Sequence, residues 1–168
     1  ATQLAVFMNA TVFEAFAPVA NRLYTTDGPA AVRALKARIL MPMTYVAVGA
    51  ATLLGCFGSD LIVAASGPAK AASGPVFAVT GVVCALQPLL MLGGYGLVLQ
   101  KKSVRVLWLM CGSLLLNLAL NLLWIPAYGV MGAVYATAIS SMALGVAHCL
   151  WVPRELRQLP DRRTAVTA

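Results

Sequence analysis

The sequence predicts an all-α integral membrane protein with about five transmembrane helices that alternate in direction. Of its 168 residues, 61% are hydrophobic and only 10% are charged, and the mean hydropathy is +0.86. A soluble domain is about half apolar and about a quarter charged, so this chain requires an apolar solvent around it. Its apolar runs approach the length of about 20 residues that crosses about 30 Å of hydrocarbon. They are apolar on all sides, unlike the alternating strands of a membrane barrel, which indicates helices.

Five runs account for residues 1–152. The first, residues 1–20, is the weakest, because Gln3, Asn9 and Glu14 interrupt it. The others are residues 39–57, 75–99, 106–125 and 129–152, and the last three contain almost no charge. Before the second run, residues 26–29 (Thr-Asp-Gly-Pro) are typical of a helix start. Residues 30–39 are therefore predicted to form a short basic amphipathic helix at the membrane surface.

Basic residues alternate between successive connections and predict the orientation. In chain order, the four connections and the carboxyl tail contain 4, 1, 3, 0 and 4 lysines and arginines. Because cytoplasmic loops are enriched in these residues, the first and third connections and the tail, residues 153–168, are predicted to be cytoplasmic. The net charge of +7 is thus attributed to an anionic membrane surface and not to nucleic acid, since no aromatic residues interleave with the basic ones.

The cysteines and the amino terminus complete the general description. Cys56, Cys84, Cys111 and Cys149 each stand alone in an apolar run, so we expect neither a metal site nor another cofactor. The chain begins within an apolar run and lacks a basic segment and cleavage site, so we expect no signal peptide. A fragment of a longer protein is the expectation.

Few polar residues inside the runs are candidates for function. A charged Glu14 in a membrane is unfavourable unless it is paired, hydrated or protonated, so it either faces a wet cavity or lies shallow near a helix end. Asn117 and Asn121 are four residues apart and share a helix face. They either line a polar path or hydrogen-bond neighbouring helices, and the second role is favoured. Gln87 precedes Pro88, which predicts a hinge or a passive bend.

Arg22 is the fifth candidate substrate-binding residue, with Glu14, Gln87, Asn117 and Asn121. It follows Glu14 by about 12 Å along a helix and lies at the predicted cytoplasmic mouth. The enrichment of basic residues on the cytoplasmic side is sufficient to explain the charge of Arg22. Attraction of an anionic head group is the alternative. We find no nucleophile elbow, phosphate loop, metalloprotease motif or paired carboxylates, so no enzyme is predicted.

One stretch resembles a known family. Residues 121–140, NLLWIPAYGVMGAVYATAIS, are similar to a signature of the polysaccharide-exporter branch of the multidrug/oligosaccharidyl-lipid/polysaccharide flippase superfamily, N-x-x-L-I-P-x-Y-G-x-x-G-A-A-x-A-T-x-I-S. The sequence departs from it at Trp124 and Val134. Pro126 is expected to end the fourth run, while Gly132 and Ala136 allow the fifth run to pack closely.

The resemblance implies a fold and a function. Members of this superfamily have two lobes of six helices. The five runs would form most of the carboxyl-terminal lobe, without the amino-terminal lobe. The implied activity is export of an undecaprenyl-pyrophosphate-linked oligosaccharide across the bacterial inner membrane by alternating access. A cation-coupled multidrug exporter of the same superfamily and a small structural membrane subunit remain alternatives. A membrane enzyme is disfavoured, because Asp27, Asp60 and His148 fall in different loops or on different sides.

Overall fold

The computed structural model describes residues 2–153 and residue 156, and only the backbone of residues 2–12. Each element in this part of the chain is a helix. Five long helices, α1 (Thr2–Thr26), α2 (Gly28–Ser66), α3 (Gly74–Gly94), α5 (Ser103–Tyr128) and α6 (Val130–Trp151), are joined by two short ones, η1 (Pro68–Ser73) and α4 (Gly96–Leu99). The fold is therefore all-helical, as predicted. The predicted basic tail, apart from residues 153 and 156, lies outside the described residues.

Four of these segments are long and apolar enough to cross a membrane: α2, α5, α6 and the segment Pro68–Leu99 that contains α3. Large apolar side chains on these helices point outward. On α5 no residue is buried, and Trp108 is 70% exposed. A helix that is apolar on all sides requires an apolar surrounding, so the architecture is that of a multi-pass membrane protein. Helix α1, which carries Asn9, Glu14 and Asn21, is not among the four.

Helix α2 differs from the sequence-based expectation. It is one helix of 39 residues, about 58 Å long at about 1.5 Å per residue. The amphipathic segment at residues 30–39 is not a separate helix, because nothing between Pro29 and Gly67 stops α2, and Pro42 lies inside it. The predicted boundary rested on the change from a basic amphipathic segment to an apolar run near Ile39, and a change in composition does not terminate a helix.

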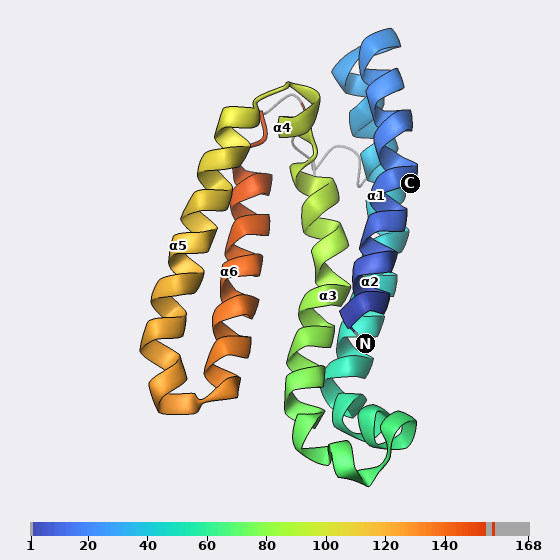
Figure 1. The fold of residues 1–168 in the computed structure, drawn as a ribbon. Coiled ribbons are helices and arrows are strands. Elements are labelled where there is room, and N and C mark those ends of the chain that lie inside the picture. Colours follow the sequence, from blue (N-terminus) through green and yellow to red (C-terminus); the bar gives the residue numbers. More distant parts are fainter. Residues whose placement is uncertain (1, 154–155, 157–168) are drawn as a thin grey trace, which may run out of the picture.

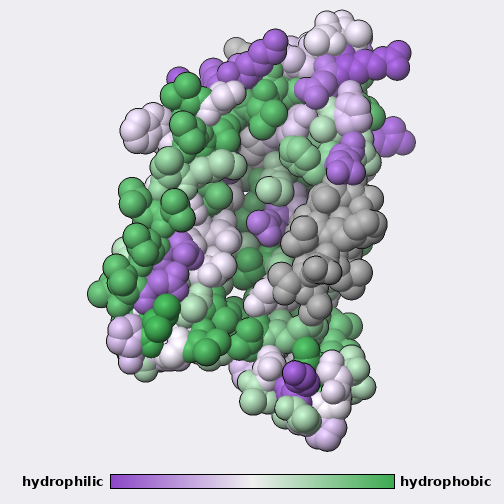
Figure 2. Space-filling view, viewed as in Figure 1, coloured by the Kyte–Doolittle hydropathy of each residue, from purple (hydrophilic) through white to green (hydrophobic). Residues whose placement is uncertain are grey.

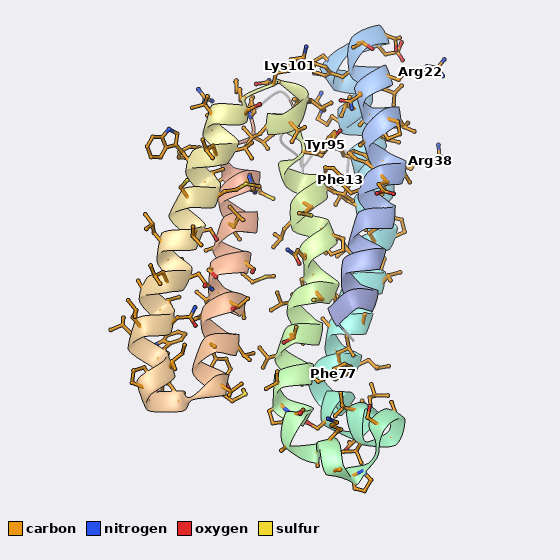
Figure 3. The ribbon with its side chains drawn as sticks, in the orientation of Figure 1. Phe13, Arg22, Arg38, Phe77, Tyr95 and Lys101 are labelled. Carbon is orange, nitrogen blue, oxygen red and sulfur yellow. The ribbon has the colours of Figure 1, made fainter. Side chains whose placement is uncertain are left out.

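The long helices alternate in direction (Figure 1). The α1–α2 turn, the α4–α5 turn and the end of α6 lie at one end of the molecule, and η1 and the α5–α6 turn lie at the other. Arg22 and Lys101 are both at the first end (Figure 3), and hydrophilic residues gather there, while apolar ones cover much of the helices (Figure 2). We call this the basic end; it is defined by Arg22, Arg33, Lys101, Lys102 and Arg105.

Helix α3 occupies the centre of the fold. It packs against α1, α2 and α6, whereas α5 packs mainly against α6. In the α2–α3 contact, a Cβ on Gly58 would lie 2.9 Å from the Ala78 Cα, and one on Gly74 would lie 2.7 Å from the Ser59 Oγ. Real Cβ atoms do not come so close, so glycine at these positions sets the spacing of α2 and α3.

Candidate functional site: polar contacts among apolar helices

A row of polar side chains joins α5 to α6, and we call it the polar ladder. Its members are Ser113, Asn117, Asn121, Thr137 and Ser140. On α5 the three residues recur every four positions and so share one face. The Ser113 hydroxyl donates to the Ser140 carbonyl oxygen at 3.0 Å, and the Asn117 Nδ2 donates to the Ser140 Oγ at 2.9 Å. The ladder therefore ties two otherwise apolar helices together.

The hydrogen bonds of the polar ladder run in one direction. The Asn121 Nδ2 donates to the Asn117 Oδ1 at 2.8 Å, Asn117 donates to Ser140, and the Ser140 Oγ donates to the Ala136 carbonyl at 2.8 Å. The chain begins at the Asn121 Oδ1, which is buried and has no hydrogen-bond partner among the described residues. A buried acceptor without a donor costs about 1–3 kcal/mol.

The turn between α5 and α6 consists of a single residue. Gly129 has φ +56° and ψ −134°, a conformation that is essentially restricted to glycine. Its N–H donates to the Ile125 carbonyl at 2.8 Å. Helix α5 thus continues past Pro126, which the sequence suggested as its end, and stops at Tyr128. Beyond the turn, Gly132 faces the Trp124 carbonyl so closely that a Cβ would overlap it.

A second polar contact lies where α3 ends. The Lys36 side chain is 1% exposed, and its Nζ donates to the Gly93 carbonyl oxygen at 2.8 Å. Helix α3 is interrupted just beyond this point, where the Tyr95 N–H bonds the Leu92 carbonyl in a three-residue pattern. Carbonyl groups in the last turn of a helix carry partial negative charge, which partly compensates the buried ammonium group.

Tyr95 anchors α1 to this break. Its ring meets the rings of Phe13 and Phe16 edge to face, each at 5.2 Å between centroids, and Figure 3 shows Phe13 beside it. The Asn21 Nδ2 donates to the Tyr95 hydroxyl oxygen at 3.2 Å. With Lys36 from α2, two helices therefore converge on the break between α3 and α4.

Helix α6 packs against the same break through glycines. A Cβ on Gly93 would lie 2.5 Å from the Cys149 Sγ, and a Cβ on Gly94 would lie 2.6 Å from the His148 Cβ. The Cys149 thiol donates to the Leu90 carbonyl at 3.5 Å and lies close enough to Lys36 to interact with it electrostatically. We call residues 93–96 and the side chains around them the junction. The four cysteines form no disulfide.

The five predicted site residues fall into separate groups. Asn117 and Asn121 are adjacent in the polar ladder. Glu14 and Arg22 are exposed on α1, and Arg22 points away from the bundle (Figure 3). Gln87 is half-buried on α3, between these groups. Whether any of them binds a substrate remains a prediction.

Sequence reasoning did not identify Lys36 or Tyr95 as members of a site. Each of the two residues stands in a sequence pattern that could have indicated its role. Lys36 continues a four-residue spacing from Val32, and both residues are buried, so a charge stands on the apolar face of α2. Tyr95 lies among three glycines in Gly-Gly-Tyr-Gly, a segment too irregular for the interior of a helix.

Comparisons of the chain with protein-family models, with curated proteins and with solved structures returned no match.

Proposed function

We propose that the chain is part of a bacterial inner-membrane flippase that moves a lipid-linked oligosaccharide by alternating access, with the basic end in the cytoplasm. The observation that carries this proposal is the polar ladder within an apolar helix pair. Four residues of the resembling stretch, Asn121, Ala136, Thr137 and Ser140, take part in its hydrogen bonds. The stretch that resembles the exporter signature thus also holds polar groups at membrane depth.

The chemistry of the ladder suits a sugar. Amide and hydroxyl groups donate to and accept from sugar hydroxyls without a net charge. Thr137 is exposed and its hydroxyl accepts only a long hydrogen bond, 3.5 Å from the Asn117 Nδ2, so it is available to a substrate hydroxyl. A pyrophosphate head group is anionic, and the basic end would attract it. The polar ladder would thus bind the sugar part of a lipid-linked glycan, and the basic end would bind its pyrophosphate.

An export assay tests the proposal. The full-length protein is produced in bacteria that lack their own oligosaccharide-lipid exporter, and surface polysaccharide is measured. We expect surface polysaccharide to be restored, and Glu14→Ala to reduce it without lowering the amount of protein in the membrane. The control is Lys70→Ala in η1, an exposed residue at the opposite end, which we expect to export normally.

The outcomes separate the parts of the proposal. No restoration by the unaltered protein, at a normal membrane level and with several glycan types, would exclude the flippase. Normal export by the Glu14→Ala variant would exclude only a coupling role for Glu14.

A multidrug exporter is the second candidate, and one observation favours it. An exposed apolar face runs along α6, formed by Ala138, Ile139, Met142, Ala143, Val146, Ala147 and Leu150. Such a surface suits an apolar drug as well as a lipid tail. Increased drug resistance of cells that produce the full-length protein, without surface polysaccharide, would select this candidate.

A further inference from the structure

We propose that Lys36 is a release group: its buried ammonium group makes the junction easy to open, so that the amino-terminal part of α2 can separate there from α3. The proposal concerns the conformational equilibrium of the helices and does not depend on what the chain transports. It follows from the position of Lys36 and from the parts of the fold on either side of it.

The closed junction is unfavourable for Lys36. Desolvating an ammonium group costs more free energy, even after the protein relaxes, than one hydrogen bond to a charged group returns. Nζ has three donors, and the only acceptor described for it is the Gly93 carbonyl at 2.8 Å. The surrounding contacts must therefore hold Lys36 in place against its tendency to return to water.

Lys36 lies near the basic end. Eight residues separate it from Gly28 at the start of α2, which is about 12 Å along the helix. The α1–α2 turn belongs to the basic end (Figure 1). A lysine side chain is long and flexible enough to turn toward such an end, so a small separation of α2 from the junction would hydrate the ammonium group.

Close contacts between α2 and α3 lie far from Lys36. They are at Gly58 on α2, which faces Ala78, and at Gly74 on α3, which faces Ser59. Gly58 is 22 residues beyond Lys36, about 33 Å along the helix. These contacts can hold the carboxyl-terminal part of α2 in place while the part around Lys36 moves.

The end of α3 is held on its other side by α6, because Gly93 and Gly94 lie directly against Cys149 and His148. The Lys36–Gly93 hydrogen bond is therefore the contact that opens when α2 moves.

The relative sizes of these two energies predict whether a substitution of Lys36 stabilises or destabilises the closed junction. Lys36→Met keeps a long side chain and removes the charge. It leaves the Gly93 carbonyl without its donor, which is unfavourable, but it also removes the larger desolvation penalty of the ammonium group. We therefore expect the variant to stabilise the closed junction, although it loses a hydrogen bond.

The experiment uses Cys149 as the reporter. In the full chain, reconstituted in lipid nanodiscs, Cys56, Cys84 and Cys111 are replaced by serine, and the rate of Cys149 modification by a maleimide is measured. We expect Lys36→Met to lower this rate about ten-fold, because the desolvation penalty that favoured opening is lost. Lys36→Arg, which keeps the charge, should stay near the rate of the parent protein, and so should Lys70→Met in η1.

A second measurement guards against a packing defect. Spin labels at Tyr45 on α2 and Val146 on α6, both exposed, should show a longer-distance population in the parent protein that Lys36→Met removes. An unchanged or faster modification of Cys149, or an unchanged distance distribution, would overturn the proposal. An equal slowing by Lys36→Arg would attribute the effect to shape and would overturn it as well.

Discussion

Asn117 is the central residue of the polar ladder, since it both donates to Ser140 and accepts from Asn121. We expect Asn117→Leu to destabilise the α5–α6 pair by about 1 kcal/mol, because hydrogen bonds between membrane helices contribute about 0.6–1.7 kcal/mol each. Reversible unfolding in mixed lipid–detergent micelles measures the change. Asn121→Leu removes one bond at the end of the ladder and should cost less; a larger loss at Asn121 would contradict the order of bonds described above.

Gly132 and Gly112 form a matched pair for testing close helix packing. A Cβ at Gly132 would meet the Trp124 backbone, with 2.6 Å to its carbonyl carbon, whereas a Cβ at Gly112 has nothing within 4 Å. Backbone cannot turn aside as a side chain can, so we expect Gly132→Ala to cost about 1–3 kcal/mol and Gly112→Ala to be neutral. The same unfolding measurement distinguishes them, and equal stabilities would refute the close contact.

At the residue scale, the sequence predicted what depends on local spacing. Asn117 and Asn121 were recognisable because four residues bring two side chains to one face of a helix. Their partner Ser140 and the burial of Lys36 depend on how separate helices dock. These contacts join residues that are 23 and 57 positions apart in the sequence. Hydrophobic periodicity describes one helix at a time and does not show which helices pack together.

Among the elements, α2 can be tested most directly. A separate surface helix at residues 30–39 and one continuous helix predict different patterns of side-chain accessibility along the chain. Val32, Lys36 and Ala47 are buried, and spacings of four and eleven residues place them on one stripe of a single straight helix. We expect the mobility of spin labels at successive positions from 30 to 50 to show one unbroken helical period, with minima on this stripe. A change of phase near residue 40 would instead indicate two helices.

The ends of the elements were harder to predict than their existence. The apolar runs located α3, α5 and α6, since their length and composition require a membrane-like environment. The exact stop of α5 depends on the φ of Gly129, +56°, and the break at Tyr95 depends on contacts from α1 and α2. Neither is visible as a change in hydropathy.

For the molecule as a whole, the alternating helices place successive connections at opposite ends. Ser73 ends η1 and Ser103 begins α5, so cysteines introduced there in a cysteine-free protein should lie on opposite sides of the membrane. We expect a membrane-impermeant thiol reagent to label Ser73→Cys in intact cells and Ser103→Cys only after the cells are opened, because the basic connections are retained inside. Labelling of both from the same side would contradict the arrangement.

The single-residue turn at Gly129 has a consequence for how the protein is made. Within α5 alone, Asn117 and Asn121 have only the hydrogen bond between them, while α6 carries the Ser140 hydroxyl that accepts from the Asn117 Nδ2. Since only Gly129 separates the two helices, α6 emerges from the ribosome directly behind α5 and can pair with it while both are still at the insertion machinery. The hairpin is therefore suited to enter the bilayer as a preassembled unit, with its asparagines already hydrogen-bonded before lipid surrounds them.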